Sequence, residues 1–204
     1  EEKWDEVFEE NILQRYEALT KAAAATEPDL IVWPETAVPG YLGIDEELTQ
    51  RLMRLAGTVR RPLLLGAPVP TFAQERVALL NSAVLLGATG QLAARYDKVH
   101  LVPFGEFVPF ERALPWLREV LPPIGDFSPG HEYTVFSTPV GSSELGVQSS
   151  NSQLATRNSQ LRFSTLICFE DVFPHLARRF VREGARLLIV ITNDAWFGPT
   201  AAAY

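Results

Sequence analysis

Short apolar segments alternate with amphipathic segments along this chain, and that alternation constrains the fold more than any other feature. Apolar residues recur at helical spacing in three segments, 4–19, 45–60 and 174–183. Compact apolar runs predict buried strands at 30–33, 63–67, 161–168 and 187–192, and a hairpin is predicted from 79–86 and 91–96. Helices interleaved with such strands indicate a layered α/β fold.

The composition excludes several classes of protein. The 204 residues are 47% hydrophobic and carry a net charge of −7, which suits a globular domain with a sizeable core. A nucleic-acid surface is not expected, because the densest basic stretch has the spacing of a solvated helix face (Arg178, Arg179, Arg182 and Arg186). The single cysteine, Cys168, excludes an intrachain disulfide and a Cys-rich zinc site. The three histidines are scattered, so we expect no metal.

Residues with possible chemical roles follow the predicted strands. Glu35 follows the first strand. Cys168 ends the strand at 161–168, and Glu170 follows it. Ligands of α/β folds gather outside the carboxyl ends of the strands, so we expect these side chains to share one crevice. The loop that begins at Asp97 adds further polar residues: Lys98, His100 and Glu106.

Each of these residues also has a purely structural explanation. A lone cysteine in an apolar strand is most often a small buried hydrophobe, and Glu35 could cap a helix. Lys98 and Glu106 could form a solvated surface pair, and His100 could be a structural histidine. The pattern alone leaves both explanations open.

The chemical explanation is nevertheless coherent. A thiol is a weak nucleophile at neutral pH unless a base takes its proton or a cation stabilises the thiolate. A carboxylate in a dry pocket can serve as that base, and an ammonium can stabilise the oxyanion of a tetrahedral intermediate. Glu35, Lys98 and Cys168 supply one of each group.

Around these residues the chain resembles the carbon–nitrogen hydrolase (nitrilase) superfamily, whose signature is a Glu–Lys–Cys triad in this chain order with a second Glu after the Lys. The resemblance is closer still to one branch of that superfamily, the apolipoprotein N-acyltransferases. Four segments carry it: WPETAVP at 33–39, DKVHLVPFGEFVP at 97–109, ICFEDVFP at 167–174 and NDAWFG at 193–198.

The resemblance implies a role for each matching residue. Glu35 would be the general base, Lys98 the cation that stabilises the oxyanion, and Cys168 the nucleophile. Glu106 would be the second carboxylate, which keeps Lys98 oriented and charged. The residues implied to shape the acyl pocket are Phe169, Glu170 and Trp196. The implied fold is an α-β-β-α sandwich, which agrees with the predicted elements.

The implied reaction is a two-step acyl transfer that needs no cofactor. Cys168 would take an acyl chain from the sn-1 ester of a phospholipid as a thioester. The free amine of a diacylglyceryl-cysteine at the N-terminus of an apolipoprotein would then accept the chain. The resemblance places the full-length enzyme in the bacterial inner membrane with its catalytic domain on the periplasmic side. This chain has no apolar run near the ~20 residues that a membrane span needs.

Two other functions fit the same residues. A nitrilase-type amidase would use the triad with water as the acceptor, and an inactive lipoprotein-binding domain would keep the fold without needing the triad. The loop at 104–117 favours the acyltransferase, because its apolar surface exceeds what a hydrolase shows to water: Phe104, Phe107, Phe110, Leu114, Trp116 and Leu117. We expect part of this loop to contact lipid, with burial in the core as the alternative.

We interpret residues 1–204 as a single, incomplete domain of this superfamily, truncated at both ends. The family fold opens with a strand before the first helix, whereas this chain opens on helical sequence at Glu1. We therefore expect these residues alone to be aggregation-prone and inactive. Within 148–160, ten of 13 residues are Ser, Thr, Asn or Gln, so we interpret this stretch as a mobile surface insertion.

Overall fold

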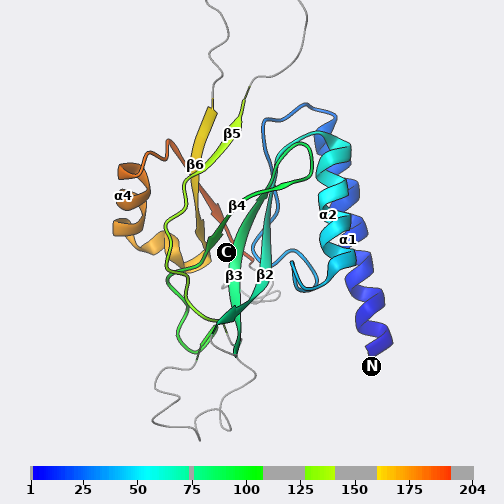
Figure 1. Ribbon diagram of the computed structural model, residues 1–204, viewed down its shortest axis with the longest axis horizontal. Coiled ribbons are helices and arrows are strands. Elements are labelled where there is room, and N and C mark those ends of the chain that lie inside the picture. Colours follow the sequence, from blue (N-terminus) through cyan, green and yellow to red (C-terminus); the bar gives the residue numbers. More distant parts are fainter. Residues whose placement is uncertain (1, 74–75, 108–126, 141–159, 194–204) are drawn as a thin grey trace, which may run out of the picture.

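The computed structural model describes residues 2–73, 76–107, 127–140 and 160–193 (Figure 1). Its elements are, in chain order, α1 (Glu2–Ala24), β1 (Ile31–Val32), α2 (Glu46–Val59), β2 (Leu63–Ala73), β3 (Arg76–Leu86), β4 (Leu92–Asp97), β5 (Phe136–Pro139), β6 (Gln160–Ile167), the 3-10 turn η1 (Cys168–Val172), α4 (Pro174–Arg182) and β7 (Leu187–Ile191).

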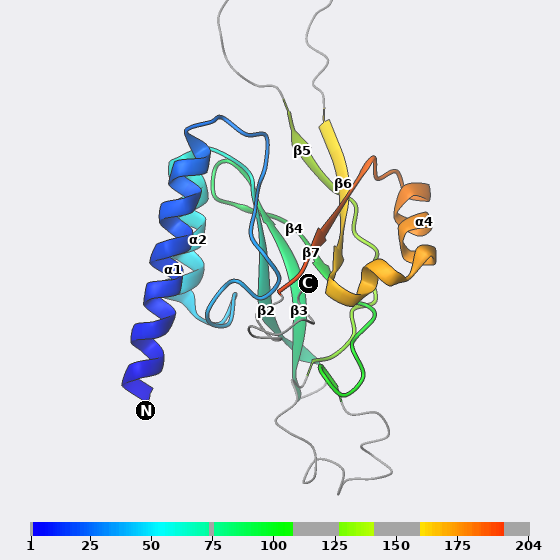
Figure 2. The same cartoon turned by 180° about the vertical axis from the view of Figure 1, so that it is seen from behind.

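Two sheets are stacked between helices. In the first sheet β1 is parallel to β2, and β2, β3 and β4 are antiparallel neighbours. In the second sheet β5 is antiparallel to β6, and β6 is parallel to β7. Helices α1 and α2 cover the outer face of the first sheet, while α4 lies outside the second, as Figure 2 shows from behind. This order of layers is the predicted α-β-β-α sandwich.

Side-chain alternation along the strands divides the core in two, because successive residues of a strand point to opposite faces. Leu63 and Leu65 of β2 pack beneath the helices with Leu52 of α2. Leu64, between them, points the other way and belongs to a second cluster with Phe163 of β6. The first sheet is therefore apolar on both faces, as a central layer of a sandwich requires.

Strand β2 is longer than the predicted 63–67. It continues through Pro68 and Pro70 to Ala73 and pairs with β3 along its whole length. Proline cannot donate a ladder hydrogen bond, so it usually marks the end or the edge of a strand. Among the described residues β1 pairs with β2 only at Leu63 and Leu64, so the rest of that edge of β2 tolerates proline.

Two of the predicted buried strands are only partly buried. Val32 of β1 is 40% exposed, and Leu187 and Val190 of β7 are 43% and 48% exposed. Among the described residues β1 pairs only with β2, and β7 only with β6. Each is therefore an edge strand, and the described residues leave its outer side chains partly uncovered.

Several predictions fall outside the described residues. They concern the loop after Phe107, the polar stretch at 148–159, and Trp196. Gln160, the last residue of the predicted insertion, is the first residue of β6. No helix in the part of the chain that the structure describes is long and apolar enough to cross a bilayer.

Candidate active site

The carboxyl ends of strands from both sheets meet at one end of the sandwich. Glu35 lies just past β1, Cys168 directly follows β6, and Asn193 lies just past β7. The backbone N–H of Asn193 donates to Oε2 of Glu35 at 3.2 Å, which joins the end of β7 to the end of β1. The crevice expected from the sequence is therefore built from two sheets.

Lys98 lies at the centre of a buried charge network. Its side chain is 1% exposed, and its Nζ donates to Oε1 of Glu35 at 3.3 Å and to Oε1 of Glu106 at 2.9 Å. Burial by itself lowers the pKa of Lys98, but the neighbouring Glu35 and Glu106 raise it by more, so the net shift is upward. The structure thus brings three of the predicted residues together around a charged ammonium.

Asn81 of β3 belongs to this network, although it is not among the predicted site residues. It is 2% exposed, and its Nδ2 donates to Oε1 of Glu35 and to Oε1 of Glu106, both at 2.8 Å. Its Oδ1 has no hydrogen-bond partner among the described residues. An amide inside an apolar strand was the signal that could have found it, because a buried amide needs polar partners.

Strained backbone surrounds the network. Cys168 has a φ of 51°, Thr36 beside Glu35 has 46°, and Phe104 has 61°. Residues with a Cβ seldom adopt this left-handed backbone conformation, and the conformation persists only where the surrounding structure holds it in place. Their gathering beside Glu35, Glu106 and the thiol makes this end of the sandwich the candidate functional site.

The Cys168 thiol is influenced by both charged partners. Burial raises the pKa of this thiol, and Glu35 raises it too. Hydrogen bonds from Thr192 and from the Phe169 backbone, together with the charge of Lys98, lower the pKa, but the net shift is upward. The thiol therefore carries its proton at neutral pH and needs a base before it can attack.

Glu170 occupies a different position from the expected wall of an acyl pocket. It is fully buried, and its Oε1 accepts the backbone N–H groups of Val99 at 2.8 Å and His100 at 3.1 Å. Its Oε2 accepts the N–H of Ile167 at 2.9 Å, and the Tyr96 hydroxyl donates at 2.9 Å to Oε1. Burial raises the pKa of Glu170, although these hydrogen bonds act against that shift. The carboxylate joins the Cys168 turn to the Lys98 segment.

Phe169 lies on the η1 turn that also carries Cys168. It follows Cys168 directly, is 39% exposed and packs edge-on against Phe173 with 5.2 Å between ring centroids. Among the described residues, no group of three or more His, Cys, Asp or Glu side chains could hold a metal ion.

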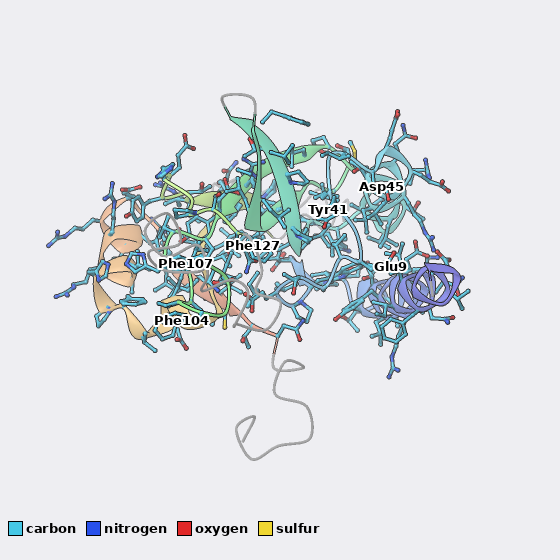
Figure 3. All side chains as sticks on the ribbon, turned by 90° about the horizontal axis from the view of Figure 1, so that it is seen from below. Glu9, Tyr41, Asp45, Phe104, Phe107 and Phe127 are labelled. Carbon is cyan, nitrogen blue, oxygen red and sulfur yellow. The ribbon has the colours of Figure 1, made fainter. Side chains whose placement is uncertain are left out.

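Aromatic side chains lie beside the site. Seen from below in Figure 3, Phe104, Phe107 and Phe127 lie near one another at this end of the molecule. Phe104 is 54% exposed, and the backbone N–H of Phe127 donates to the carbonyl of Glu106 at 3.0 Å. These rings border the segment that carries Glu106.

Comparison with known proteins identifies relatives. The model of the carbon–nitrogen hydrolase family matches residues 5–204. An apolipoprotein N-acyltransferase from Geobacter metallireducens is 40% identical over 203 residues, which are 99% of this chain and 35% of the relative. One from Chlorobaculum tepidum is 33% identical over 217 residues, which cover 97% of this chain and 38% of the relative. The chain thus spans little more than a third of these relatives.

Solved structures share the fold at low sequence identity. A carbon–nitrogen hydrolase from Helicobacter pylori G27 matches with a TM-score of 0.62 at 19% identity, over 90% of this chain and 55% of that one. Nit3 of Saccharomyces cerevisiae, a member of the nitrilase superfamily, matches with a TM-score of 0.59 at 21% identity, over 95% of this chain and 63% of that one. These likenesses confirm the predicted nitrilase-like fold.

Proposed function

Because the chain belongs to the carbon–nitrogen hydrolase family, we propose that it is catalytic sequence of an apolipoprotein N-acyltransferase. Cys168 is the nucleophile, Glu35 the general base and Lys98 the cation that stabilises the oxyanion. The observation that carries this assignment is the Lys98 ammonium, 1% exposed and held 3.3 Å from Glu35 and 2.9 Å from Glu106. Glu106 and Asn81 fix the network from the side of the first sheet.

The first half-reaction moves the acyl chain to the enzyme. Glu35 accepts the thiol proton, and the sulfur of Cys168 attacks the sn-1 ester carbonyl of a phospholipid. Lys98 and the backbone N–H of Phe169 stabilise the oxyanion that forms. The carbon–oxygen bond then breaks, Glu35 returns the proton to the leaving alkoxide, and lysophospholipid departs, leaving a thioester on Cys168.

The second half-reaction delivers the chain to an amine. The free α-amine of a diacylglyceryl-cysteine attacks the thioester, and Glu35 accepts a proton from it. The carbon–sulfur bond breaks, and the proton returns to Cys168. A thioester suits this sequence because it stays activated towards amines when water is kept out. No step calls for a cofactor.

The acyl chain needs an apolar pocket beside the sulfur. Phe169, 39% exposed and adjacent to the nucleophile, forms part of its wall in this proposal. The proposal also assigns Trp196, which lies outside the described residues, to acyl-chain binding. Glu170 supports the pocket from behind, since its buried carboxylate holds the turn on which Cys168 and Phe169 lie. From the likeness to the apolipoprotein N-acyltransferases, we place the full-length enzyme at the bacterial inner membrane, with this domain on the periplasmic side.

Trapping of the thioester tests the proposal. We expect full-length enzyme, given phospholipid and no acceptor, to accumulate an acyl group on Cys168 that intact-protein mass spectrometry detects. The Cys168→Ala variant should carry none. Glu35→Gln should bind lipid but acylate more slowly by a factor of about 10²–10⁴, the usual contribution of a general base. An adduct that persists in Cys168→Ala contradicts the assignment of the nucleophile, and rapid loss of the adduct to water alone would favour a hydrolase.

A further inference from the structure

Two histidines that are distant in sequence meet beside the site. His100 lies two residues after Lys98, and His175 is the second residue of α4. Their Nε2 atoms are 3.1 Å apart, which is hydrogen-bond distance. The His100 ring also packs edge-on against Phe173, with 4.5 Å between ring centroids. The side chain of His100 therefore docks between η1 and α4.

The proton positions follow from burial. Nδ1 of His100 is buried and has no hydrogen-bond partner among the described residues. A proton there would be a buried donor without an acceptor, which folded proteins avoid. A neutral imidazole has one N–H, so the proton of His100 belongs on Nε2 and is donated to Nε2 of His175. His175, which is exposed, must then be unprotonated at that atom.

This bond links the two halves of the proposed catalytic machinery. On one side, His100 continues the segment that carries Lys98; on the other, α4 follows the turn that carries Cys168. Among the described residues, Glu170 also joins these two segments, because its carboxylate accepts the N–H groups of Val99 and His100 and the Tyr96 hydroxyl. The side-chain pair thus supplements a single buried carboxylate.

Other charged groups lie around the pair. Glu170 of η1 accepts the His100 backbone N–H, and Lys98 is occupied by Glu35 and Glu106. On α4, Arg178 and Arg179 stand one helical turn after His175, and Arg179 pairs with Glu183 at 3.1 Å. Asp171 is exposed on η1. Among these residues, His175 is the exposed imidazole.

We infer that His175 is a positioning residue. Its neutral Nε2 accepts a hydrogen bond from His100, and this bond holds the Lys98 segment against the Cys168 turn. When His175 binds a proton in acid, the Lys98 segment is released. This inference rests on the proposed roles of Lys98 and Cys168. A protonated His175 presents an N–H to the N–H of His100, so the bond persists only if the His100 proton moves to the buried Nδ1, where it has no acceptor among the described residues. Lys98 then stabilises the thiolate less well.

The rate at which iodoacetamide alkylates Cys168 in the full-length protein tests the inference. Peptide mass spectrometry measures this rate from about pH 5 to pH 8. We compare wild type with His175→Ala, which removes the acceptor, and with His175→Gln, whose side-chain oxygen can accept the proton without titrating. The ratio of the wild-type rate to the His175→Gln rate cancels the titration of the thiol itself. His131→Gln, at an exposed histidine, is the matched control.

We expect the ratio of wild type to His175→Gln to be constant near pH 8 and to fall by about 3- to 10-fold towards pH 5, the worth of one hydrogen bond. At pH 8, alkylation of Cys168 in His175→Ala should be slower than in wild type by a similar factor. Alkylation in His175→Gln should recover most of that loss. A ratio that does not vary with pH, or wild-type alkylation in His175→Ala, overturns the inference. Alkylation needs no acyl donor, so failure of the acyl adduct to form would overturn the proposed function without deciding this result. If Cys168 is inert to iodoacetamide, the same ratio measured on acyl-adduct formation decides.

Discussion

Two opposite charges act on the sulfur of Cys168. Glu35 raises the pKa of the thiol and Lys98 lowers it, on top of the upward shift that burial causes. The sulfur therefore stays a thiol until a base removes its proton, and in the proposed mechanism that base is Glu35, the same residue that disfavours the thiolate in the resting site. This arrangement protects a reactive sulfur between turnovers, because the thiolate is the form that reacts with electrophiles.

Removing the charge of Lys98 and removing the charge of Glu35 should shift the pKa of the Cys168 thiol in opposite directions. In Lys98→Met the pKa of Cys168 should rise, so alkylation by iodoacetamide at fixed pH should slow by about tenfold for each unit of the shift. In Glu35→Gln the pKa should fall, so alkylation should not slow even though acylation does. The measurement is the rate of alkylation against pH in the full-length protein.

Lys21→Met is the matched control, since Lys21 is an exposed residue near the end of α1. Its profile should coincide with that of wild type. If Lys98→Met and Glu35→Gln shift the profile in the same direction, the proposed division of charge at the sulfur is wrong.

At the scale of elements, the sequence predicted the strand ends well because each is an apolar run followed by a polar residue. Glu35 after β1 and Cys168 after β6 were found in this way. The extent of β2 was missed because Pro68 and Pro70 usually end strands, and only the pairing with β3 reveals that they do not. Asn81 and His175 were missed because their partners are far away in the sequence. Contacts of that kind depend on the packing of the sheets, and the local pattern does not record them.

One glycine of β2 decides where Glu35 lies. A Cβ added to Gly66 would stand 2.1 Å from the Pro34 carbonyl oxygen and 2.6 Å from Cα of Glu35. The N–H of Val38 also donates to the carbonyl of Gly66 at 3.2 Å, so the segment after β1 lies directly on this part of β2. No side chain fits between the two backbones.

Gly66→Ala should therefore displace Glu35 without removing any catalytic group. Small displacements of reacting groups can cost about 10²-fold, so we expect acyl-adduct formation on Cys168 to slow by roughly that factor. Gly57→Ala on α2 is the control, because a Cβ there meets its nearest atom at 3.3 Å. Adduct formation at the wild-type rate in Gly66→Ala would show that the loop can move without affecting the base.

At the scale of the whole molecule, the site exists only where the two sheets meet. The first sheet and its loops supply Glu35, Lys98 and Glu106, and the second supplies Cys168. The sandwich could be predicted from the alternation of elements, and the members of the site from their positions after strands. Their mutual geometry could not, since it depends on the Glu170 and Asn193 contacts that bridge the layers.

The same end of the molecule carries exposed apolar side chains. Phe104 is 54% exposed, and the cross-strand pair Phe72 and Val77 at the end of the β2–β3 hairpin is 76% and 63% exposed. Because β2 runs parallel to β1, the end of this hairpin projects on the side of the strand ends that carry Glu35. Apolar groups around the entrance of a site are what a donor held in a lipid surface requires.

The double substitution Phe104→Ser and Phe107→Ser should weaken use of membrane phospholipid and leave the chemistry intact. Burying one Phe is worth ~1.5–3 kcal/mol, so we expect the KM of the full-length enzyme for vesicle phospholipid to rise by about tenfold or more. Alkylation of Cys168 and turnover of a short-chain, water-soluble acyl ester should stay at wild-type rates.

Val181→Ser is the matched control, because Val181 is 57% exposed on α4. The last turn of α4 leads into β7, so Val181 lies at the opposite end of the sandwich from the site. An unchanged KM in the double variant, or an equal rise in Val181→Ser, would show that the aromatic residues beside Glu106 do not meet the lipid.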